Sequence, residues 1–132
     1  MKKLPLQPEG WAPPRGYANG VAARGTTIYV AGQIGWNAQC QFESDDFVAQ
    51  VRQALANIVA VLAAGGAEPA HLTRMTWYVT NKREYLARGR EVGAAFRELI
   101  GDYAIAMSAV EVSALMEDRA LVEIEATAVQ PD

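Results

Sequence analysis

The sequence predicts a single α+β domain, because helical and strand periodicities alternate along a chain of 132 residues. This length is close to the most common domain size, and 51% hydrophobic with 20% charged residues is ordinary for a globular protein. No linker, internal repeat or low-complexity tract divides the chain, so we expect residues 1–132 to form one domain. The proline-rich segment 1–15 is expected to be an irregular lead-in.

The first half of the chain predicts strands followed by a long helix. Apolar and polar residues alternate in Thr26–Ala31, which indicates a strand, and Gly16–Ala23 could pair with it as a hairpin. From Asp45 to Leu62, apolar residues recur at spacings of three and four, which is typical of an amphipathic helix. We expect Ser44 to be its N-cap and Gly65-Gly66 to be its left-handed stop.

The second half predicts a strand, a helix and two further strands. Leu72–Val79 is rich in β-formers, and Asn81 is a typical N-cap for a helix that runs to Ile100. Gly89 has low helix propensity, so we expect a break near it. Strands are predicted at Ala104–Val112 and Leu121–Val129, joined by a loop.

The resulting order is ββαβαββ, with two helices on one face of a mixed sheet. Each helix crosses over between strands, and right-handed crossovers place both helices on the same face. In the last strand, Val122 and Ile124 suit packing against the helices, whereas Glu123 and Glu125 point to the opposite face. That half-apolar, half-acidic face either lies in water or meets another subunit, and composition alone leaves both possibilities open.

Charge and residue counts exclude several classes of function. The net charge is −3 and no Lys/Arg cluster is present, which disfavours a nucleic-acid partner. One cysteine, Cys40, and one histidine, His71, cannot form an intramolecular disulfide or a protein-based zinc site. No apolar region follows Lys2 and Lys3, and the longest apolar stretch, Ile58–Ala64, is too short to span a bilayer. We therefore expect a cytoplasmic protein with no membrane association, metal or cofactor.

A few side chains are candidates for a site. Glu123 is either a solvated strand carboxylate, which the pattern alone favours, or a carboxylate in a partly apolar cleft that orients water and shuttles protons. Tyr17 and Trp36 lie at strand ends and loops, where amphipathic rings often line pockets. Trp77 lies in mid-strand and is expected in the core.

Four segments together carry a family resemblance. They are Tyr29-Val30-Ala31-Gly32-Gln33-Ile34, Gln53-Ala54-Leu55-Ala56-Asn57-Ile58, Thr76-Trp77-Tyr78-Val79-Thr80, and the ending Val110-Glu111-Val112 followed by Val122-Glu123-Ile124-Glu125-Ala126. In this order they resemble the Rid family, the reactive intermediate (enamine/imine) deaminases. The resemblance implies a chorismate-mutase-like ββαβαββ subunit and a homotrimer with clefts between subunits. It also implies hydrolysis of 2-aminoacrylate and its imine tautomer to a 2-keto acid and ammonia, without metal or cofactor.

The resemblance carries over only in part at the level of site residues. It implies that Glu123 positions the attacking water. The family's Arg-Ser-Cys-Val run reads Met107-Ser108-Ala109-Val110 here, so the arginine that clamps the substrate carboxylate is absent, and a family asparagine falls on Gly89. Arg15, next to Tyr17, could replace the missing charge. The candidate substrate-binding residues are Tyr17, Gly32, Gln33, Trp36, Met107, Ser108, Ala109 and Arg15.

Two functions follow from these residues. The first is a hydrolytic deaminase-like protein that acts on a small imine, enamine or related reactive metabolite in an inter-subunit cleft, with water oriented by Glu123. The alternative is a non-catalytic small-molecule-binding or regulatory trimer of the same fold. Loss of the arginine favours the alternative, whereas the presence of Glu123 and Tyr17 favours the hydrolase.

Overall fold

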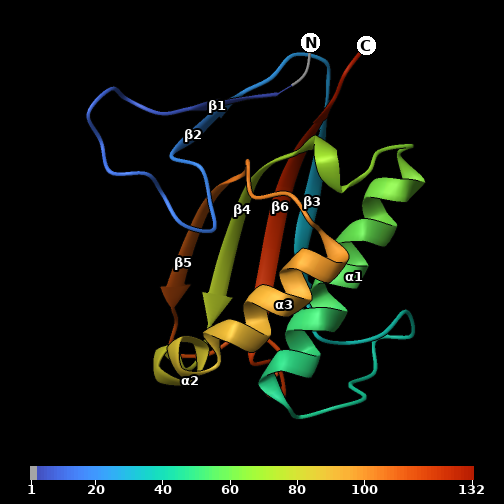
Figure 1. Cartoon of the computed structure of the whole chain (residues 1–132). Coiled ribbons are helices and arrows are strands. Elements are labelled where there is room, and N and C mark those ends of the chain that lie inside the picture. The colour runs from blue at the N-terminus through green and yellow to red at the C-terminus, as the bar shows by residue number, and fades with distance from the viewer. Residues whose placement is uncertain (1–2) are drawn as a thin grey trace.

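The computed structural model describes residues 3–132 and has an α+β architecture (Figure 1). The elements in chain order are β1 (Leu4–Leu6), β2 (Gly20–Ala22), β3 (Thr26–Ile34), α1 (Phe47–Ala64), the 3₁₀ turn η1 (Pro69–His71), β4 (Leu72–Val79), α2 (Lys82–Ala87), α3 (Gly89–Leu99), β5 (Ala106–Glu111) and β6 (Val122–Gln130). Four strands form the main sheet in the order β3-β6-β4-β5, and β1 and β2 form a separate two-stranded sheet. The predicted fold class is therefore confirmed.

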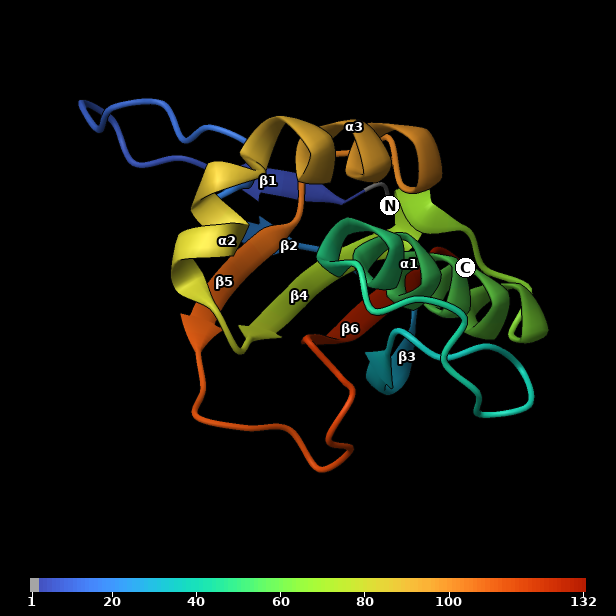
Figure 2. The ribbon, with the colours of Figure 1, turned by 90° about the horizontal axis from the view of Figure 1, so that it is seen from below.

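The main sheet is mixed, and its helices lie on one face. β4 and β5 pair in parallel across the α2–α3 crossover, whereas β6 runs antiparallel to both of its neighbours, β3 and β4. Figure 2 shows α1 and α3 side by side above the sheet, with β5 at one edge and β3 at the other. The predicted placement of the helices is correct, and it leaves the opposite face of the sheet without a helical cover.

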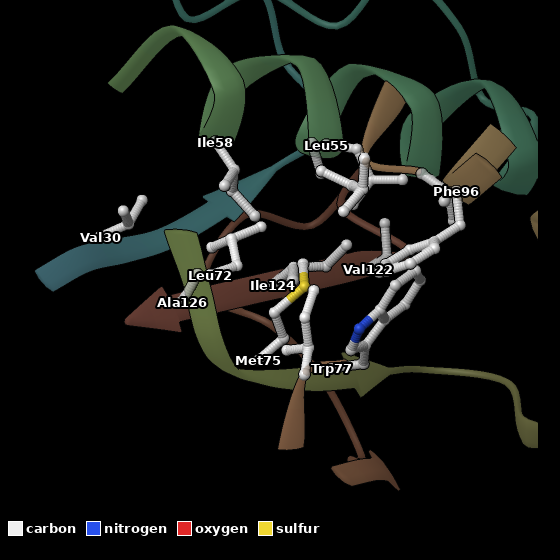
Figure 3. Close-up of a cluster of buried hydrophobic side chains, with 14 of the residues drawn as sticks. Val30, Leu55, Ile58, Leu72, Met75, Trp77, Phe96, Val122, Ile124 and Ala126 are labelled. Atoms are coloured by element: carbon white, nitrogen blue, oxygen red, sulfur yellow. The ribbon is translucent and has the colours of Figure 1, made fainter. Parts of the chain in front are cut away.

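The core lies between the helices and the sheet (Figure 3). Leu55 and Ile58 of α1 are fully buried, and they face Met75 and Trp77 of β4 and Ile124 of β6. Burial of each such side chain stabilises the fold by roughly 1.5–3 kcal/mol. By length and composition alone α1 could cross a membrane, but eight of its residues are buried and pack against the sheet and α3.

The start of α1 differs from the prediction, whereas its end does not. Asp46, not Ser44, is the N-cap, and its carboxylate accepts a hydrogen bond from the Ala49 N–H at 3.0 Å. The Ser44 hydroxyl instead accepts from the Asp46 N–H at 3.0 Å, because the helix begins two residues later than that cap would require. Gly66 has φ +76° and ends the helix in the left-handed region, as predicted.

The predicted second helix is two helices, with the expected break at Gly89. Asn81 caps α2 by accepting from the Glu84 N–H at 3.1 Å. Arg88, at φ −103° and ψ 24°, closes α2 and leads into α3. Its guanidinium donates to Asp46 at 2.6 Å and to Glu91 at 2.7 Å, so it ties the joint to the start of α1.

The N-terminal segment contradicts two predictions. β2 pairs antiparallel with β1, not with β3, so the predicted hairpin is wrong. The lead-in expected to be irregular contains β1. The Lys3 ammonium anchors this segment, since it pairs with Asp102 at 2.9 Å and donates to the Leu72 carbonyl at 2.7 Å. These partners lie far along the chain, and local sequence pattern carries no signal for them.

Candidate functional site

Glu123 lies on the uncovered face of the sheet, as the strand alternation predicted. Its neighbours Val122 and Ile124 are fully buried on the helix side, whereas Glu123 itself is half-buried. Its partner across β4 is Tyr78, whose hydroxyl donates to Glu125 at 2.8 Å. This hydrogen bond, with a smaller contribution from Glu123, raises the pKa of Tyr78. Within residues 3–132 no Lys or Arg forms an ion pair with Glu123.

The Glu123 side chain lies directly against the backbone of Gly32. The β3–β6 register shifts between Val30 and Gln33, so Gly32 lies in the irregular part of the ladder. A Cβ on Gly32 would lie 2.5 Å from Glu123 Oε2 and 2.8 Å from Cδ, so a side chain at this position would force the Glu123 carboxylate to move. Glycine here lets the carboxylate approach the backbone closely.

Gln33 and Trp36 lie near the same end of β3, and both make contacts with residues close to them in the structure. The Gln33 amide donates to the Ala31 carbonyl at 3.1 Å. The Trp36 ring packs against Phe42 with centroids 5.9 Å apart, and the Trp36 carbonyl accepts from Asn57 at 2.8 Å. We call Glu123, Gly32 and Gln33 the carboxylate half-site.

A cavity of about 450 Å³ lies at the other edge of the sheet, between β5 and the helices α2 and α3. We call it the aromatic cavity, because aromatic side chains dominate its lining. These side chains are Tyr17, Trp77, Tyr85, Phe96 and Tyr103. β5 contributes Met107, Ser108 and Ala109, while α3 contributes Gly89 and Gly93. Among residues 3–132, Arg15, which is exposed, is the one charged residue of the lining.

Met107 faces the aromatic cavity because of the register between β4 and β5. Met107 lies opposite Met75, and Ala109 lies opposite Trp77, both of which point into the core. The odd-numbered residues of β5 therefore face the helices. Glu123 faces the other way, since it lies opposite Tyr78, one position out of phase with Trp77.

One chain consequently does not bring all the predicted site residues together. Arg15, Tyr17, Met107, Ser108 and Ala109 line the aromatic cavity, whereas Gly32, Gln33, Trp36 and Glu123 do not. β4 separates β5 from β6, which puts these strands about 10 Å apart at the usual strand spacing. Met107 and Trp36, both candidate substrate-binding residues, therefore do not line one wall within a single chain.

The edge of β5 beside the aromatic cavity is only partly paired. The Val112 N–H donates to Val79 of β4 at 2.8 Å, and the Ile105 carbonyl accepts from Ala18 on the opposite side at 2.8 Å. Ala18 forms an isolated parallel bridge with Ala106, which occupies this edge as far as Met107. Because backbone groups alternate in direction along a strand, the Ala109 N–H also points away from β4, beyond that bridge, and it can donate to a ligand.

The remaining candidates for chemistry have local structural roles. His71 Nδ1 accepts from the Glu68 N–H at 3.1 Å and helps cap the η1 turn. Cys40 is exposed in the loop before α1, at φ +60°. Neither lines the aromatic cavity or belongs to the carboxylate half-site.

Several cavity residues were not singled out from the sequence as site residues, although a signal for them exists. Gly89, Val92, Gly93 and Phe96 follow the i, i+3, i+4, i+7 spacing that marks the sheet-facing stripe of a helix. Two glycines in such a stripe remove side-chain volume where the helix meets the sheet. From the sequence, Gly89 is expected to break the helix and falls where the family resemblance implies an asparagine.

Comparisons with known proteins agree with the fold. Residues 10–130 match the family model described as endoribonuclease L-PSP. The chain is 33% identical over 106 residues to a RutC family protein of Pasteurella multocida, covering 80% of this chain and 81% of the relative. It is 32% identical over 114 residues to the 2-iminobutanoate/2-iminopropanoate deaminase of Escherichia coli, covering 86% and 87%.

A solved structure extends the similarity to nearly the whole chain. The YyfB protein of Yersinia pestis, described as a member of the conserved Rid protein family, superposes with a TM-score of 0.84 at 34% identity, covering 98% of this chain and 100% of that protein. Sequence and fold thus point to the same group of proteins. The chain belongs to the endoribonuclease L-PSP family, which is the Rid family that its sequence resembles.

Proposed function

We propose that the protein is a hydrolytic deaminase for a small imine or enamine and that each active site combines two copies of the chain. One observation carries the proposal: the carboxylate half-site and the aromatic cavity lie towards opposite edges of the sheet and face in opposite directions. A water-orienting carboxylate can act on a ligand in the aromatic cavity only if a second chain supplies it. Some relatives carry the name of an imine deaminase, which supports this class of reaction.

Head-to-tail association would form such shared sites. When the β5 edge of one copy meets the β3 side of the next, the interface is heterologous, and rotation closes it into a ring. We propose a ring of three, with the uncovered sheet faces turned inward. This arrangement would cover Tyr29 of β3, whose side chain is 80% exposed in the single chain.

The chemistry needs few groups. Water adds to the imine carbon while Glu123 accepts one of its protons, and the π electrons of the C=N bond move to nitrogen, to which Glu123 passes that proton. The resulting carbinolamine collapses when Glu123 accepts the hydroxyl proton and delivers it to the nitrogen, so that the carbonyl forms, the C–N bond breaks and ammonia leaves. Substrate would be held by the edge amide of Ala109 and by the Tyr17 hydroxyl.

Met107 changes which substrates this site prefers. A bidentate contact between arginine and a carboxylate is worth roughly 1.5–3 kcal/mol, and a methionine cannot provide it. Arg15 lines the same cavity, and within residues 3–132 it forms no ion pair, which supports it as the partial substitute. Binding of the preferred substrate should therefore rely less on a substrate carboxylate than binding of 2-aminoacrylate does.

Ammonia release from enzymatically generated 2-aminoacrylate tests the proposal. We expect weak turnover by the wild-type protein, a gain of about tenfold or more in Met107→Arg, and its loss in Met107→Arg/Glu123→Gln. Glu125→Gln, which removes the neighbouring carboxylate of the same face, serves as the control and should retain turnover. Sedimentation of each variant checks that the assembly is intact.

The non-catalytic alternative predicts different results. A binding protein would take up the ligand without releasing ammonia, and Met107→Arg would tighten binding without creating turnover. Undiminished turnover in Glu123→Gln would refute the role of this carboxylate.

A further inference from the structure

We infer that the substrate carries an apolar, ring-sized substituent that occupies the aromatic cavity. This inference rests on the proposed function, because it names the class of imine that the site accepts. The substrate would be an imine whose carbon bears a benzyl or branched alkyl group. Its C=N group would lie at the open edge of β5, and its substituent would point between β5 and α3.

The aromatic cavity exists because two side chains are missing from α3. Gly89 and Gly93 alternate with Val92 and Phe96 along the stripe that faces the sheet. A Cβ on Gly89 would meet nothing within 4 Å, and one on Gly93 would meet only the end of the flexible Arg97 side chain, at 3.5 Å. Neither glycine has positive φ, so backbone conformation does not demand glycine at these positions. The two glycines, one exposed and one half-buried, therefore leave open space along this part of the cavity lining.

The walls of the cavity are held in place by contacts among the aromatic rings. Phe96 stacks on Tyr103 with centroids 5.1 Å apart. Trp77 contacts both Phe96, at 6.3 Å, and Tyr85, at 6.2 Å. Burial raises the pKa of Tyr85, so this wall stays uncharged at neutral pH. A preformed ring cluster of this kind favours a planar apolar group and lowers the entropic cost of binding.

Size and polarity favour the same class of occupant. An apolar cavity of roughly 150 Å³ is enough to bind benzene. The aromatic cavity, at about 450 Å³, therefore accommodates a ring-bearing substituent together with the reacting group. A two- or three-carbon imine would leave most of the apolar wall in contact with water, and it would forgo about 25 cal/mol for each Å² of apolar surface that a larger substituent could bury.

A panel of imines tests the inference. An amino acid oxidase converts alanine, leucine and phenylalanine into 2-imino acids, and the release of ammonia above the uncatalysed rate is measured. We expect kcat/KM for the phenylalanine-derived imine to exceed that for the alanine-derived imine by about tenfold or more. Gly89→Leu should lower that ratio by about tenfold, because its side chain enters the cavity. Arg90→Leu adds the same side chain at the next position, which does not line the cavity, and should leave the ratio unchanged.

Binding of the stable 2-keto products separates this inference from the proposed hydrolysis. Calorimetry compares phenylpyruvate with pyruvate, and we expect phenylpyruvate to bind more tightly to the wild-type protein but not to Gly89→Leu. If that preference is found without turnover of any imine, the cavity inference stands and the hydrolase proposal fails. If the alanine-derived imine is hydrolysed at least as well and phenylpyruvate binds no tighter than pyruvate, the inference is overturned while the hydrolase proposal survives.

Discussion

Gly32 and Glu123 depend on each other. The carboxylate lies so close to the Gly32 backbone that a Cβ would overlap it, and Gly32 lies within the shift in β-ladder register between Val30 and Gln33. The position of the carboxylate is therefore set by a residue without a side chain. For a group that must orient one water molecule, a displacement of about 1 Å can cost 100-fold in rate.

Gly32→Ala is expected to reduce turnover about tenfold or more while leaving the protein folded, because the added methyl displaces the Glu123 carboxylate. Gly20→Ala, whose Cβ would make only ordinary contacts of 3.5 Å with Leu6, is the control and should keep full activity. Turnover and thermal unfolding are measured for both variants. Full activity in Gly32→Ala would contradict the role given to this contact.

Single residues also mark where sequence-based prediction succeeds and fails. The direction of Glu123 followed from the alternation of buried and open positions along its strand, and this is correct. The same reasoning could not show which face of the sheet Met107 lies on. β5 is an edge strand with few buried residues, so burial does not distinguish its two faces, and only its register with β4 does. Gln50 shows the same limit. Its buried amide donates to the Arg119 carbonyl and accepts from the Leu121 N–H, both about 70 positions along the chain.

The two longest helices are joined at their ends by one ion-pair cluster. Asp46 caps α1 and also accepts from Arg88, which lies between α2 and α3. The hydrogen bond from Arg88, followed by that from the Ala49 N–H, lowers the pKa of Asp46. α3 forms one wall of the aromatic cavity, so this cluster also supports the proposed site.

Asp46→Ala should lower the free energy of unfolding by about 1 kcal/mol at neutral pH, through loss of the helix cap. Asp46→Asn keeps a capping oxygen and should cost less. Because the pKa of Asp46 is lowered in the folded state, its charge-dependent stabilisation is complete above the ordinary carboxyl pKa of about 4 and is lost as the pH falls through the lowered value. Urea unfolding at equal protein concentration, at pH 7 and in acid, measures both effects. A cost that is independent of pH would contradict the Arg88 pairing.

Helices and strands were predictable to the extent that they depend on local pattern. The apolar spacing of α1, the Gly65-Gly66 stop, the Asn81 cap and the break at Gly89 all followed from nearby residues. Strand pairing did not. β2 pairs with β1, and β6 inserts between β3 and β4, because pairing is decided by which apolar faces can be buried together in three dimensions.

Across the whole molecule, the two proposed half-sites lie towards opposite edges of one sheet. A protein that built its site within a single chain would have no reason to separate a half-buried carboxylate from an aromatic cavity in this way. Head-to-tail assembly resolves the separation, since every interface then joins one cavity to one carboxylate. In a ring, each copy contributes to two sites and no half-site is left unused.

Subunit mixing tests this claim most directly. Ala109→Trp fills the aromatic cavity, and Glu123→Gln removes the carboxylate, so each variant alone should be inactive on the best imine of the panel. Refolding the two variants together in equal amounts should restore about one quarter of wild-type turnover, because that fraction of random interfaces joins an intact cavity to an intact carboxylate. If the mixture stays as inactive as the separate variants, although mixed rings are shown to form, the active site is not shared between chains.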